Sequence, residues 1–119
     1  MNKLIISSLL ALTQKKIPNP ELDLRLLLQH ASKNNKSIIL SNTNIEDINM
    51  KYFNSLLEKR LKNQPISKII KKKYFWKSEF YVDTNVLDPR PETEIIIEEL
   101  LTQIKDKNKK LKILDIGTG

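Results

Sequence analysis

The chain has 119 residues, enough for one small domain or for one domain and part of another, but not for a helical bundle followed by a complete α/β enzyme domain. Hydrophobic residues make up 39% and charged residues 29%, a balance typical of soluble globular chains rather than of disordered or membrane-embedded ones. There is no cysteine, which excludes disulfides and thiolate metal sites, and there is one histidine. We therefore expect no bound metal and a cytoplasmic location.

The net charge of +7 is unevenly distributed. Residues 1–87 carry 15 Lys+Arg against 7 Asp+Glu, whereas residues 88–119 carry 6 against 7. A basic first part favours an acidic protein partner, a ribosomal setting or RNA. Direct binding to nucleic acid is possible but is not the favoured interpretation. The alternative is that the basic charge reflects the overall composition rather than a binding role, because Lys, Asn and Ile are abundant throughout the chain.

Apolar residues at helical spacing predict a first helix near residues 2–14. A signal peptide is the alternative, but two serines break the apolar run and no clear cleavage site follows. No segment approaches the roughly 20 apolar residues of a membrane-spanning helix. Asn19 and Pro20 predict the start of a second helix reaching about Lys33, because asparagine is a good N-cap and proline suits the first helical position. Its buried face should hold Leu24, Leu27, Leu28 and Ala31, with His30 at the surface or partly buried.

A third helix is predicted behind Thr43 and Glu46, whose spacing fits a capping box. Apolar residues keep helical spacing from Ile45 to about Asn63. A short segment over residues 66–70 follows and leads into three lysines. The first part of the chain is therefore predicted to be a helical bundle.

The pattern changes after these lysines. Residues 74–83 are aromatic and roughly alternating, which predicts a strand or hairpin. Pro91 can begin a further helix. Residues 111–116 predict a mainly buried strand that runs into Gly117. The apolar face of the helix after Pro91 should carry Ile95, Ile96, Leu100 and Ile104.

The motif LKILDIGTG combines a strand, Asp115 at its end, and then Gly117 and Gly119. This is how domains that bind dinucleotides or S-adenosylmethionine open, because glycine lets the backbone approach the ligand closely. The alternative is a strand that simply leaves through a glycine turn. A P-loop is not supported, since no Gly-Lys-Ser/Thr follows.

A second motif, DPRPETE, covers residues 88–94. Its two prolines hold Arg90 between them in a rigid turn, and Thr93 and Glu94 fall in the first helical turn. The alternative is a purely structural role, because proline before a helix is common and a glutamate at a helix start interacts favourably with the helix dipole.

Together these motifs resemble the release-factor glutamine methyltransferases, the HemK-like proteins. The similar stretches are FWKSEFYVDTNVLDPRPETE and LKILDIGTG, and the resemblance reaches back through ELDLRLLLQH and LEKRLKNQPISKII to cover most of the chain. The family usually has isoleucine at the position of Asp88, and tyrosine and glycine at those of Lys68 and Lys71.

The resemblance implies a mainly α fold in three parts. Residues 1–73 would be a helical domain that recognises release factors, residues 74–88 a β-hairpin linker, and residues 89–119 the start of a truncated α/β, Rossmann-like methyltransferase domain. The implied cofactor is S-adenosylmethionine, which this chain should bind weakly or not at all. The implied cofactor-binding residues are Arg90, Pro91, Thr93, Asp115, Gly117, Thr118 and Gly119.

Full-length relatives are expected to methylate the glutamine of the Gly-Gly-Gln motif in class I peptide chain release factors, which are the expected partners. The family's Asn-Pro-Pro-Tyr motif, which holds the substrate amide, does not occur in this sequence. We therefore assign no catalytic residue and expect the chain alone to be inactive. The alternatives are a non-catalytic basic binding module, the remnant of an interrupted gene, or a relative that methylates a ribosomal-protein glutamine.

Overall fold

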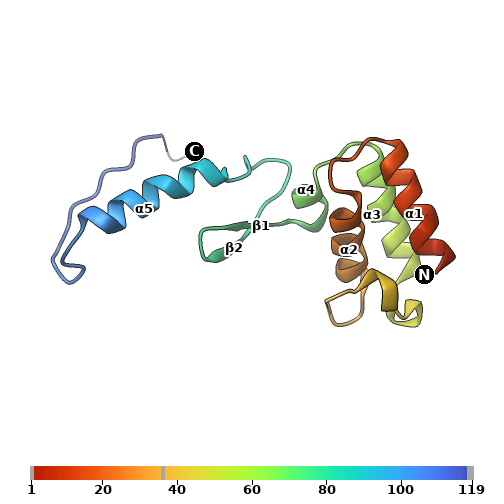
Figure 1. Ribbon diagram of the computed structural model, residues 1–119. Helices are drawn as coiled ribbons and strands as arrows, with labels where there is room; N and C mark the ends of the chain where they lie inside the picture. Colours follow the sequence, from red (N-terminus) through yellow and green to blue (C-terminus); the bar gives the residue numbers. More distant parts are fainter. Residues whose placement is uncertain (1, 36, 118–119) are drawn as a thin grey trace.

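The computed structural model describes residues 2–35 and 37–117 and measures 57 × 26 × 21 Å along its principal axes. The fold is mainly helical, as predicted, and elongated: a helical bundle at one end, a hairpin in the middle and a further helix at the other end (Figure 1). The elements are α1 (Lys3–Gln14), α2 (Pro20–Ala31), α3 (Met50–Leu61), α4 (Ile66–Ile70), β1 (Lys72–Phe75), β2 (Ser78–Tyr81) and α5 (Glu94–Gln103).

The core lies where α1, α2 and α3 pack side by side, with α4 closing one end (Figure 1). The predicted inner face of α2 is confirmed, because all four of its expected residues are buried. Burying such apolar side chains supplies most of the stability of a domain of this size. Within this core, the side chains that are almost fully buried are Ile5, Leu12, Leu24, Leu27, Leu28, Phe53 and Leu56.

An ion pair also joins α2 to the end of α3. Arg60 Nε donates to Asp23 Oδ2 at 2.6 Å, and Arg60 Nη1 donates to the backbone oxygen of Gln64 at 3.0 Å. Asp23 stands in the first turn of α2 but faces inward and is buried. The pair therefore fixes the two helices at a place where the apolar core ends.

Asparagine side chains begin two of the three long helices of the bundle. Asn2 Oδ1 accepts from the Leu4 N–H at 3.0 Å, and Asn49 Oδ1 accepts from the Tyr52 N–H at 3.0 Å. The second helix begins at Pro20 as predicted, but the Asn19 side chain makes no capping hydrogen bond. The fixed backbone of proline is therefore the device that starts α2.

The capping box predicted for Thr43 and Glu46 is wrong. Thr43 Oγ1 donates to the Ile39 carbonyl at 2.7 Å, residues 45–47 form only a 3₁₀ turn, and α3 begins at Met50. The reason is a tertiary contact: Ile48 forms an antiparallel bridge with Ser32, which holds its backbone extended and interrupts the helix.

The hairpin was predicted over residues 74–83, and its first strand begins two residues earlier, at Lys72. β1 and β2 are antiparallel, with Lys72 opposite Tyr81 and Phe75 opposite Ser78. Lys71 sits between α4 and β1 at φ 57°, in the left-handed region that favours glycine. A lysine thus occupies a turn position whose backbone favours glycine.

The helix predicted after Pro91 is confirmed as a 3₁₀ turn over residues 91–93 followed by α5. The buried strand predicted for residues 111–116 is wrong, because this segment has no regular secondary structure, is exposed and pairs with no described strand. A strand gains its hydrogen bonds only from a neighbour, and none is provided by the described residues. Apolar side chains of α5 and of this segment are therefore exposed, among them Ile95, Ile96, Ile113, Leu114 and Ile116.

Candidate functional site

The motif over residues 88–94 is tied to the helical bundle at its first residue. Asp88 Oδ2 accepts from Ser67 Oγ at 2.5 Å, and Asp88 Oδ1 lies 2.7 Å from Lys68 Nζ in an ion pair. Lys68 Nζ also donates to the backbone oxygen of Val86. Burial on its own raises the pKa of the Asp88 carboxyl, but the contacts with Lys68 and Ser67 outweigh it and leave the pKa below its ordinary value.

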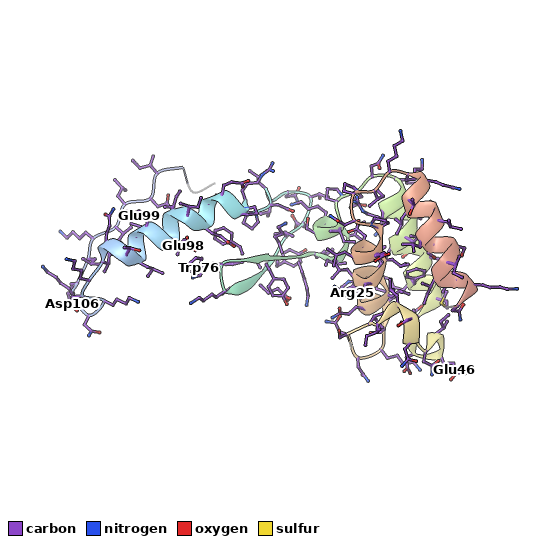
Figure 2. The ribbon with its side chains drawn as sticks, in the orientation of Figure 1. Arg25, Glu46, Trp76, Glu98, Glu99 and Asp106 are labelled. Atoms are coloured by element: carbon purple, nitrogen blue, oxygen red, sulfur yellow. The ribbon has the colours of Figure 1, made fainter. Side chains whose placement is uncertain are left out.

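The same motif is tied to the hairpin at its last residue. Glu94 Oε1 accepts from the backbone N–H of Trp76 at 2.7 Å. Trp76 occupies the turn of the hairpin at φ 55°, and Figure 2 shows it at the end of the hairpin that lies toward α5. Glu94 is also the first residue of α5, so one carboxylate connects the hairpin turn to the helix start.

Arg90 lies between these two contacts, and its side chain makes no hydrogen bond or ion pair with any described residue. Arg90 and Pro91 line an open groove of about 520 Å³ together with Pro65, Lys68 and Lys73. Thr93 donates its backbone N–H to the Arg90 carbonyl at 3.0 Å, which fixes the turn between them. The arginine is thus an exposed, unpaired cation on a fixed backbone.

The glycine-rich end does not join this groove. The residues that line the groove include neither Asp115 nor Gly117, and both of these are exposed. Gly117 has φ 81°, and an added Cβ would meet no atom within 4 Å. Thr118 and Gly119 lie outside the described residues. The seven residues implied by the resemblance therefore form no common pocket that fits S-adenosylmethionine within the part of the chain that is described.

The lysine cluster near the hairpin is partly neutralised. Lys68 pairs with Asp88, and Lys72 Nζ pairs with Glu79 Oε1 at 2.9 Å. This leaves Lys71, Lys73 and Lys77 without an ion-pair partner among the described residues. The basic character that the sequence indicates is real, but fewer of these charges are free than their number suggests.

A larger groove, of about 730 Å³, runs between α2, α4 and the hairpin, and the sequence motifs did not indicate it. His30, half-buried at its edge, lies against Tyr52 with a ring separation of 5.8 Å. Burial, together with the positive charge of Lys72, lowers the pKa of His30. The apolar part of the lining comes from Leu22, Leu26, Ile66 and Ile70.

Two classes of site find no support in residues 2–35 and 37–117. No group of three or more His, Cys, Asp or Glu side chains there could hold a metal ion. No described helix is long and apolar enough to cross a membrane.

Comparison with known proteins identifies the helical part. Residues 4–70, which run from the second residue of α1 to the end of α4, match the family model described as the PrmC N-terminal domain. The chain belongs to this family. The matched region ends at Ile70, the last residue of α4, two residues before β1 begins.

Curated relatives carry the name release factor glutamine methyltransferase. Those of Buchnera aphidicola from Acyrthosiphon pisum and of Haemophilus influenzae are 39% and 36% identical over 87% and 85% of this chain, and each match covers 37% of the relative. The relative of Francisella tularensis is 30% identical over 100% of the chain and 44% of its own length. The chain thus spans about two fifths of the length of these relatives. No solved structure matches the chain significantly.

Proposed function

We propose that this chain forms the N-terminal part of a release factor glutamine methyltransferase. Residues 1–73 recognise the release factor, residues 74–88 link, and residues 89–119 begin the methyltransferase domain. The observation that carries the proposal is the identity of 36–39% with relatives of that name over 85–87% of the chain. The geometry supports it, because the bundle has its own core whereas α5 leaves large apolar side chains uncovered.

In the whole protein, the methyl group of S-adenosylmethionine would pass to the side-chain amide nitrogen of the Gly-Gly-Gln glutamine. The lone pair of an amide nitrogen is delocalised, so the amide must be held in a suitable orientation, and positioning is the main source of rate enhancement. Arg90, Pro91 and Thr93 would form one edge of the cofactor site. This chain contributes the docking of the partner and that edge, and alone it does not catalyse methyl transfer.

The catalytic part of the proposal is tested by label transfer. The chain is mixed with a class I release factor and labelled S-adenosylmethionine, beside a longer version that carries the Asn-Pro-Pro-Tyr motif. Label is expected in the Gly-Gly-Gln glutamine only with the longer version. Label transferred by the 119 residues alone would overturn the assignment of catalysis to other residues.

The docking part is tested by titration with release factor at low and at raised salt. Binding should be weak and salt-sensitive, because charge attraction speeds encounter with an acidic surface. Replacing Lys71, Lys73 and Lys77 with glutamine should weaken it. A matched control replaces Lys3, Lys15 and Lys16, which are exposed on and after α1. Equal loss in the two triple variants would show that net charge, rather than this face, drives the association.

A further inference from the structure

The chain crosses back from the hairpin to the bundle before it enters α5. Val82, the residue after β2, is buried and donates its N–H to the Lys71 carbonyl at 3.2 Å. Residues 83–88 then return to α4, where the Ser67 hydroxyl and the Lys68 ammonium group contact Asp88. This return brings the first residue of the 88–94 motif against the bundle, 20 residues along the chain from Lys68.

The contact at this point is more shielded than an ordinary surface ion pair. The Lys68 and Asp88 side chains are 13% and 26% exposed, against 72% and 66% for the Lys62 and Glu58 pair. Exposed pairs contribute little because water and salt screen them, whereas a partly buried charge is costly to leave without its partner. Lys68 and Asp88 therefore depend on each other more than typical surface charges do.

We propose that Lys68, Ser67 and Asp88 form a clamp that holds the 88–94 segment against α4 and so fixes the position of Arg90. The Glu94 contact with the Trp76 N–H holds the other end of the segment. With both ends held, the backbone on each side of Arg90 is set, and its unpaired side chain is presented to the groove. Lys68 and Asp88 are positioning residues in this arrangement. The inference deepens the proposed function, but its test needs no enzymatic activity.

The test measures backbone order by ¹⁵N relaxation in the whole 119-residue chain. In the unmodified chain, Leu87 and Arg90 should have order parameters close to those of α4, about 0.85. Lys68→Met and Asp88→Asn should lower them to below about 0.6. Lys68→Arg, and the exchange Lys68→Asp with Asp88→Lys, should restore at least part of the loss. The matched control is Lys72→Met, which breaks the neighbouring ion pair within the hairpin.

Two results would overturn the clamp: unchanged order at residues 84–92 in both charge-removing variants, or equal loosening in the Lys72→Met control. A second measurement avoids variants that fold poorly. In the unmodified chain, the Asp88 carboxyl and the Val86 and Lys68 amides should titrate together, with a midpoint below the ordinary 3.8 of aspartate. Ser67, Lys68 and Lys73 are the groups facing this carboxyl. A midpoint at or above 3.8 would also overturn the proposal, whereas failure of the longer version to transfer label would count only against the proposed function.

Discussion

Removing the Asp23 carboxylate should destabilise the helical bundle far more than removing an exposed carboxylate at the same distance from its partner. The Asp23–Arg60 and Glu58–Lys62 pairs both have nitrogen–oxygen distances of 2.6 Å. The first pair is 7% and 13% exposed, so Asp23→Ala leaves a largely buried guanidinium without a counter-charge. Loss of one partner of a buried pair costs about 3 kcal/mol.

That loss is large for so small a bundle. At the usual stability per residue, the free energy of unfolding of residues 4–70 is roughly 3–10 kcal/mol in all. A loss of about 3 kcal/mol should lower the melting temperature by roughly 15 °C. The assay is thermal unfolding followed by far-ultraviolet circular dichroism, with Glu58→Ala as the matched control, which should leave the curve almost unchanged because water screens that pair. Equal shifts in the two variants would refute the argument from burial.

Three further outcomes are expected. Lys71→Gly should stabilise the chain by about 0.5–1 kcal/mol, because the strain that lysine suffers at φ 57° exceeds the extra entropy that glycine gives the unfolded chain. Urea unfolding measures the change, and a loss of stability would show that Lys71 is not strained. Burial and Lys72 lower the pKa of His30, so the folded state binds a proton at His30 less readily than the unfolded state does. The free energy of unfolding should therefore fall as the pH drops below 6.5, the ordinary pKa of histidine. His30→Gln should make the stability less dependent on pH in this range. Hydrogen exchange should be slow over Phe53–Leu61 and fast over 111–116, and equal protection would show that the second segment is paired in solution.

The bundle was largely predictable because each helix carries its own signal. The positions of Leu24, Leu27 and Leu28 define one face of α2, and the structure buries all three. Helical hydrogen bonds are local, so a pattern within a dozen residues both predicts the element and satisfies its backbone. The capping box failed for the opposite reason, since the bridge between Ser32 and Ile48 is a tertiary contact that no local pattern contains.

The sequence predicted the residues of the candidate site but not the tertiary contacts that hold them. The prolines around Arg90 indicated a rigid turn, and the structure has that turn. The contacts of Asp88 with Lys68 and of Glu94 with Trp76 span 20 and 18 residues, beyond the range of any periodic signal.

The hairpin and the segment over residues 111–116 show where the limit lies. Both have alternating or continuous apolar patterns, yet only the hairpin forms strands, because its two halves are close in sequence and satisfy each other's backbone groups. The later segment has the composition of a buried strand, with Ile113, Leu114 and Ile116 exposed for want of a described neighbour. A strand pattern therefore specifies what a segment can pair with rather than what it forms alone, whereas a helical pattern specifies the element itself. This difference explains why the bundle forms its own core within residues 4–70, while α5 and the segment after it leave large apolar side chains exposed.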